Sequence, residues 1–184
     1  AAGRALAPHL PSVLPWWWLA HWDPDPEPAA AARAALESAV PPERHARALA
    51  RCMSHVLAAV KEALSHATPQ EMAAAEALRL GPDELVEAHA RAHCRALRAL
   101  AALLELGASA LGPEASEEVQ AFAASQYEGS RWLRGFASAA DPSVRSAAYG
   151  LLAALARRAP GAATGLKAAA GVALGALGER DAAA

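Results

Sequence analysis

Four of the protein's five tryptophans lie close together, in the stretch PWWWLAHWDP at positions 15–24. Trp buries a large surface, and aromatic side chains contribute much of the energy of cores and interfaces. Trp18 and Trp22 are four residues apart, and leucines precede them at the same spacing, which indicates one buried face of a helix over residues 5–22. Trp16 lies on the opposite side of that helix and is therefore a candidate for contact with a partner.

The composition is typical of an all-helical protein. The chain has 184 residues, is rich in Ala and Leu, and contains few of the β-branched residues that favour strands. Its formal net charge of -2 gives no support for binding nucleic acid or a membrane through bulk charge. Cys52 and Cys94 do not make a disulfide framework and fit a reducing compartment, so we expect a cytosolic protein. No apolar run reaches the length of about 20 residues that a membrane helix needs.

Pro and Gly residues divide the remainder into further helices. The run DPDPEP at 23–28 ends the first helix, and Pro28 suits the first position of the next. Thr68 and Glu71 form a capping box that starts another helix. The longest helix is expected to bury an apolar stripe consisting of Val86, Leu97, Leu100 and Leu104. The predicted helices cover 5–22, 28–40, 42–66, 82–107, 113–125, 130–138 and 142–158, with a weaker one at 162–177.

The opening of the helix at 142–158 favours one architecture. Asp141 is a natural N-cap, Pro142 suits the first helical position, and in HEAT-type helix pairs the arginine of such an opening, here Arg145, reaches toward the adjoining repeat. We therefore predict an all-α solenoid of HEAT/ARM-like helical hairpins, with an irregular helical bundle as the alternative. Residues 1–184 are expected to form a single helical-repeat segment of a longer chain, with helix pairs at about 5–40, 42–107 and 113–158.

No group of residues predicts a catalytic, cofactor or metal site. His89 and His93 share a helix face beside Cys94, as zinc ligands can, but the motif His-Glu-x-x-His is absent, and we expect two partly exposed histidines instead. Neither Cys52 nor Cys94 has an obvious neighbour that would activate its thiol, so both are predicted to be buried structural residues. The stretch GAATGLKAAAG at 161–171 lacks the Gly-Lys-Ser/Thr ending of a phosphate-binding loop.

Two rows of arginines are candidates for binding a partner, the first consisting of Arg44, Arg47 and Arg51 and the second of Arg91, Arg95 and Arg98. Such rows bind phosphate groups or acidic protein surfaces. The alternative is a solvated helix face on which the arginines pair locally with Glu43, Glu87 and Glu105. The candidate partner-binding residues are thus Trp16 and these six arginines. The residues predicted to have structural roles are Trp18, Trp22, Asp141, Pro142 and Arg145.

Several stretches, taken in order, resemble one protein family. The chain contains LAPHL at 6–10, a Trp-rich helix ending in HWD at 21–23, and AARAALESAVPP at 31–42, followed by a helix that contains Cys52. Trp132 and the stretch PSVRSAAY at 142–149 follow later. In this order and at this spacing, these features resemble the N-terminal region of the listerin family, over about residues 5–160.

The resemblance implies a scaffold without chemistry of its own. Listerins are RING-type ubiquitin ligases of ribosome-associated quality control, built as long HEAT/ARM solenoids with a C-terminal RING. They act on stalled large ribosomal subunits, and their N-terminal region docks on the subunit and on the factor that extends stalled nascent chains. A monomer with no membrane and no small-molecule substrate is expected, and zinc is expected only in a RING domain outside these residues. The alternatives are a generic HEAT-repeat adaptor of transport or chromatin type and a small helical metal or thiol enzyme.

Overall fold

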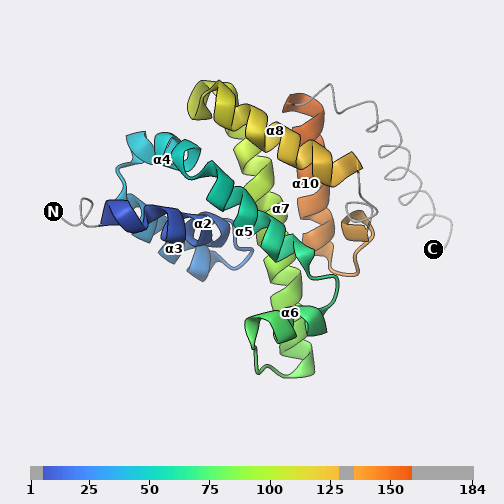
Figure 1. Ribbon diagram of the computed structural model, residues 1–184. Coiled ribbons are helices and arrows are strands. Elements are labelled where there is room, and N and C mark those ends of the chain that lie inside the picture. The colour runs from blue at the N-terminus through green and yellow to red at the C-terminus, as the bar shows by residue number, and fades with distance from the viewer. Residues whose placement is uncertain (1–5, 129–134, 159–184) are drawn as a thin grey trace.

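The computed structural model describes residues 6–128 and 135–158 (Figure 1). Within those two ranges all regular secondary structure is helical, which confirms the all-α prediction. The predicted helix at 162–177, most of the predicted helix at 130–138 and the residue Trp132 lie outside the described residues.

The N-terminal tryptophan stretch forms the expected helix, which begins later than predicted. A 3-10 turn, η1 (Ala7–His9), leads into α2 (Leu10–His21). The next helix, α3 (Pro26–Ala39), begins at Pro26 and not at Pro28, because the Asp25 carboxylate accepts a hydrogen bond from the backbone N–H of Glu27 at 3.0 Å. An Asp at this position satisfies an amide that has no partner within the helix, which fixes the start.

The prediction of one helix over 42–66 is wrong. The chain forms a 3-10 turn, η2 (Pro42–Arg44), then α4 (His45–Arg51) and α5 (Met53–Ser65), with a break at Cys52. The N–H of Cys52 bonds to the carbonyls both three and four residues earlier, at 3.0 and 3.1 Å, so the turn is tightened there. The resulting change of direction lets both helices pack against the long helix described next.

Two further helices follow, and their ends match the local signals closely. The hydroxyl of Thr68 accepts from the N–H of Glu71 at 3.2 Å, which confirms the capping interaction at the start of α6 (Pro69–Glu76). The longest helix, α7 (Pro82–Leu111), was predicted to end at Gly107. The backbone leaves helical geometry at Gly107, with φ of 60°, and resumes for one more turn. Only Gly adopts this conformation without strain.

The C-terminal part consists of α8 (Pro113–Glu128) and α10 (Pro142–Arg158). Asp141 caps α10 as predicted, since its carboxylate accepts from the N–H groups of the second and third helical residues at 2.7 and 3.2 Å. The hydrogen bonds that the structure describes for the Arg145 side chain are local. Its guanidinium donates to the carbonyls of Ala139 and Ala140, both at 2.7 Å, and so secures the turn that precedes its own helix.

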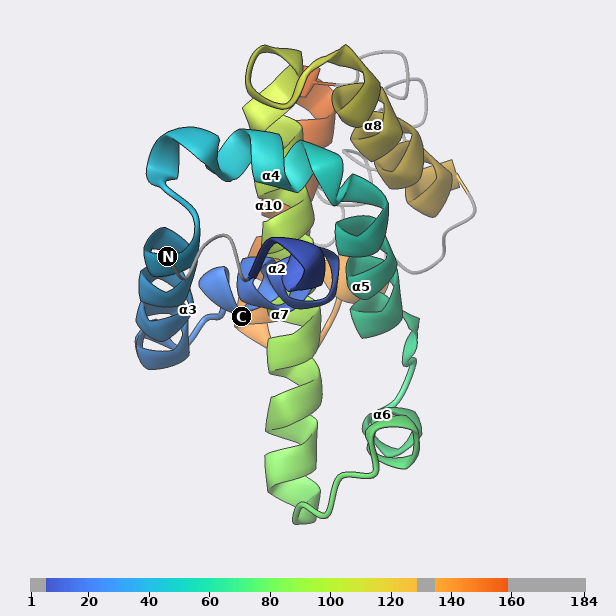
Figure 2. The same cartoon turned by 60° about the vertical axis from the view of Figure 1, so that its left-hand side comes forward.

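The helices are arranged around α7. It contacts α2, α4, α5, α6, α8 and α10, and in Figures 1 and 2 it runs through the centre of the molecule. Both a helical repeat and an irregular bundle are compatible with one central helix shared by earlier and later elements. The division into three helix pairs stays a prediction.

The two halves of α7 have different surroundings. The second half carries fully buried leucines, among them Leu97 and Leu100, as predicted. The first half extends beyond the body of the molecule with α6 beside it (Figure 2). The prediction that Val86 is buried is therefore wrong: its side chain is 57% exposed, because none of the described helices covers that face of α7.

Candidate docking surfaces

The tryptophan stretch is divided between core and surface. Trp18 is 6% exposed, and its indole N–H donates to the carbonyl of Ala99 in α7 at 3.3 Å. Trp22 packs edge-on against Trp18 with ring centroids 5.7 Å apart and is half-buried. Both thus tie α2 to the core, in agreement with the structural role expected for them. Trp16 is 50% exposed, so it presents a large aromatic surface to solvent.

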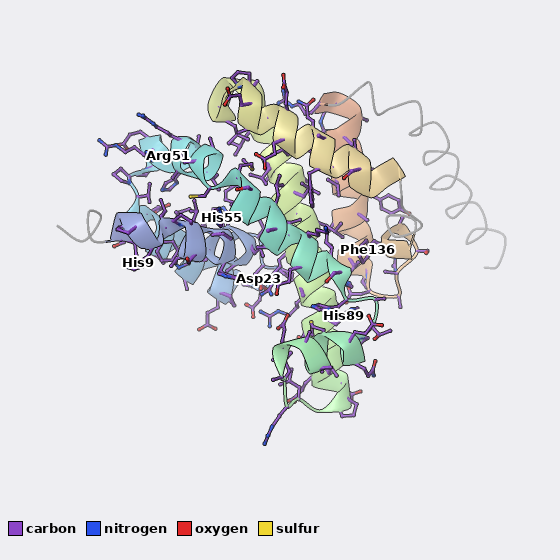
Figure 3. The ribbon with its side chains drawn as sticks, viewed as in Figure 1. His9, Asp23, Arg51, His55, His89 and Phe136 are labelled. Carbon is purple, nitrogen blue, oxygen red and sulfur yellow. The ribbon has the colours of Figure 1, made fainter. Side chains whose placement is uncertain are left out.

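The first arginine row forms an exposed basic surface, which we call the α4 face. It consists of Arg44 at the end of η2 together with Arg47 and Arg51 on α4, all exposed. None of the three forms an ion pair within the described ranges. Figure 3 shows Arg51 on α4, far from the labelled His89 and Phe136. The α4 face therefore presents three guanidinium groups that are available to an anionic partner.

The second arginine row is not one continuous surface, because Arg91 is held within the molecule. Its guanidinium lies 3.1 Å from the carboxylate of Asp23 and 3.7 Å from that of Asp25. The Asp23 side chain is 4% exposed and also accepts from the N–H of Asp25 at 2.9 Å. This ion pair fixes the turn between α2 and α3 against α7. Sequence reasoning missed Asp23 because 68 positions separate it from its partner.

The remaining two arginines of that row have different environments. The Nε atom of Arg95 is buried without a hydrogen-bond partner among the described residues. Arg98 lines a groove between α7 and α10. Glu105 was a predicted partner of these rows but is bound by Arg157 and Arg158, whose Nε atoms donate to its carboxylate at 2.9 and 3.1 Å. These hydrogen bonds lower the pKa of the Glu105 carboxyl.

A pocket of about 690 Å³ lies between the end of α5, the first half of α7 and the residues around Phe136. His89 and His93 both direct Nε2 at the carbonyl oxygen of His66, at 2.9 and 3.1 Å, and His93 packs edge-on against Phe136. The expectation of two partly exposed histidines is wrong for His93, which is 5% exposed. Burial, and to a smaller extent the neighbouring His89, lowers the pKa of His93 to about 4.

The candidate metal and thiol chemistry gains no support from the geometry. In the part of the chain that the structure describes, no three His, Cys, Asp or Glu side chains come together in a way that could hold a metal ion. Cys52 and Cys94 are both buried, and burial raises the pKa of each thiol. The Cys94 thiol donates to the carbonyl of Ser143 at 3.6 Å. Raised pKa values disfavour the thiolate, which is the reactive form.

Comparison with known proteins identifies the family. Residues 1–183 match the family described as the N-terminal domain of the E3 ubiquitin-protein ligase listerin. The chain belongs to the listerin family. This confirms the resemblance drawn from the ordered motifs, and it covers nearly the whole chain.

A curated mouse protein, E3 ubiquitin-protein ligase listerin, is 30% identical to the chain over 157 residues, which is 85% of this chain. The chain spans about 8% of the length of that relative. No solved structure matches this listerin-family chain significantly. None of its described helices has the length and apolar character required to cross a bilayer.

Proposed function

We propose that this listerin-family segment is a non-catalytic docking module of a RING-type ubiquitin ligase that acts in the cytosol on stalled large ribosomal subunits. In this role it would bind the large subunit and the factor that extends stalled nascent chains. The observation that carries the proposal is the match of residues 1–183 to the N-terminal domain of listerin. The described part of this helical segment buries both of its cysteines and exposes Trp16 and the arginines of the α4 face, which supports binding in preference to chemistry.

The α4 face is the surface best suited to such docking. Its three exposed arginines lie within one short segment, Arg44 at the end of η2 and Arg47 and Arg51 on α4, and each can form charge-assisted hydrogen bonds with phosphate or carboxylate oxygens. Ribosomal subunits expose both RNA phosphates and protein, and binding through phosphates weakens as salt increases because bound counterions are released. The exposed Trp16 adds an aromatic surface on α2, of the kind that anchors interfaces.

The test is co-sedimentation of the purified chain with purified large ribosomal subunits over a range of salt concentrations. We expect binding that exceeds that of an unrelated helical-repeat protein and that weakens steadily with salt. Replacing Arg44, Arg47 and Arg51 together by Glu should reduce the affinity by roughly tenfold or more, since several charge-assisted contacts are lost.

The matched control is a single charge reversal at another exposed arginine. Arg47→Glu should weaken binding, whereas Arg79→Glu, on the connection between α6 and α7, should leave it unchanged. Co-sedimentation no greater than that of the unrelated protein contradicts the proposal. Equal loss in the two single variants would show that net charge matters and that the α4 face does not.

A further inference from the structure

A second apolar surface lies on the seam between α7 and α10, away from the α4 face. A groove of about 700 Å³ runs between the two helices, and Trp18 and Trp22 of α2 contribute to its wall. Most of its lining is apolar and consists of short side chains, including Ala101, Ala102, Leu106, Ala147 and Ala154. We call this the α7–α10 groove. Figure 1 shows the two helices α7 and α10 side by side.

The groove has room for a further helix. Gly150 lies on its α10 side and is exposed, and apart from its own helix backbone no described atom lies within 4 Å of the position that a Cβ would take there. Ala101, Ala102 and Leu106 are only partly buried against the core. Short side chains on two adjacent helices allow the backbone of a third helix to approach closely, since the distance between packed helices depends on the side chains at the contact.

The lining of the groove carries more positive than negative charge. Arg98 lines it and forms no ion pair with any described residue. Glu105, the carboxylate of the lining, is shared by Arg157 and Arg158, so one negative charge faces two positive ones. The groove therefore combines an apolar floor with a net surplus of guanidinium charge, and carboxylates on a partner would complement it.

We infer that the α7–α10 groove binds an amphipathic helix of a partner protein, one whose apolar stripe is flanked by Glu or Asp residues. The apolar stripe would cover the alanines and Leu106, and acidic side chains would reach Arg98 and, two turns further along α7, the pair of arginines around Glu105. Helix-in-groove recognition requires this combination of anchors and flanking charge. Nucleic acid fits less well, because an apolar floor offers its phosphates no hydrogen-bond donors.

The probe is a fluorescein-labelled 18-residue peptide with leucines at helical spacing on one face and glutamates on both flanks, titrated with the full chain by fluorescence anisotropy. We expect saturable binding that weakens with added salt. The same peptide with Lys in place of Glu should bind roughly tenfold more weakly, because its charges then face like charges. A scrambled acidic peptide without the apolar stripe should not bind measurably.

Two pairs of variants locate the binding. Gly150→Trp places a large side chain in the groove and should reduce the affinity more than tenfold, whereas Gly150→Ala adds one methyl group into open space and should retain it. Arg98→Glu should weaken binding of the acidic peptide, and Arg79→Glu should not. Circular dichroism and thermal melting establish that each variant is folded.

Further outcomes would overturn the proposal or assign the groove to another occupant. Equal binding by the wild-type chain and Gly150→Trp overturns the proposal, as does equal binding of the Glu and Lys peptides. Displacement of the acidic peptide by a single-stranded RNA oligonucleotide as effectively as by unlabelled peptide would assign the groove to nucleic acid. A dimer that Gly150→Trp dissociates in sedimentation equilibrium would assign it to a second copy of the chain. Because the groove is separate from the α4 face, these results leave ribosomal docking by that face untouched.

Discussion

The two halves of α7 belong to one helix and have opposite environments. The second half, around Leu100, carries the fully buried leucines Leu97, Leu100 and Leu103. The first half, around Val86, extends beyond the body of the molecule with α6 beside it (Figure 2) and leaves an apolar side chain in water. A helical pattern of apolar residues thus identifies the face that can be buried, and only neighbouring elements decide which part of that face is covered.

The largest contrast is expected from truncating one apolar residue in each half. Leu100→Ala should lower the free energy of unfolding by about 3 kcal/mol, because it removes buried methyl groups and leaves a cavity. Val86→Ala should change it by less than about 0.5 kcal/mol, because the side chain is already exposed. Urea denaturation of both variants measures the difference. Equal losses would mean that the first half is covered in solution.

A pH-dependent effect is expected at the boundary between the halves, where His93 lies. Burial lowers its pKa to about 4 in the folded state, so between pH 6.5 and 4 the unfolded chain binds more protons than the folded one. Stability should therefore fall as the pH falls, by about 2 kcal/mol between pH 7.5 and 5. Urea titrations at the two pH values measure the fall.

The control for that prediction is His93→Leu, which replaces the titrating imidazole with an apolar side chain of similar length. The variant should lose most of the dependence on pH in this range, even if its stability at pH 7.5 differs. Burial also lowers the pKa of His21, so a dependence that persists in full in this variant would contradict the assignment to His93 and point to His21 instead.

A smaller effect is expected from the ion pair that ties the α2–α3 turn to α7. Asp23→Asn keeps an oxygen for the N–H of Asp25 but removes the charge that faces Arg91, and should cost about 1–2 kcal/mol of unfolding free energy. Asp25→Asn is the matched change at the exposed partner and should cost less than about 0.5 kcal/mol. Thermal or urea unfolding distinguishes the two, and a larger loss at Asp25 would contradict the geometry.

The smallest effect concerns α6, which flanks the first half of α7. Ala77 ends this helix with φ of 53°, a left-handed conformation that is unfavourable for Ala. Ala77→Gly should therefore stabilise the protein by about 0.5–1 kcal/mol. Ala74→Gly, in the exposed interior of the same helix, should destabilise it by about 1 kcal/mol. Urea denaturation gives both values, and a loss of stability at Ala77 would show that its backbone is not strained.

The sequence predicted the helical class and the ends of several helices because their causes are local. Thr68 and Asp141 cap helices through hydrogen bonds to amides two or three residues away, so their roles follow from sequence spacing alone. The inward position of Trp18 follows equally from helical periodicity. The family was identified from the order of short motifs, which the match over residues 1–183 confirms.

The failures have causes that are not local. The break at Cys52 has no Pro or Gly to mark it and arises because α4 and α5 must each contact α7. Burial of His93 depends on Phe136 and on the carbonyl of His66, which come from other parts of the chain. Arg91 was assigned to a docking row because its partner, Asp23, is distant in sequence. Among the docking candidates, periodicity grouped the arginines into rows. It could not show which of them form ion pairs with carboxylates elsewhere in the fold.

The two buried cysteines allow local unfolding to be measured in the unmodified protein. Cys52 lies at the α4–α5 break and Cys94 in the more buried part of α7, and they are 3% and 1% exposed. A thiol-specific reagent can react with each only while the surrounding helices are separated. The two alkylation rates would therefore report separately how often each region opens, without any introduced label, and would show whether a bound peptide or ribosomal subunit closes one region, the other or both.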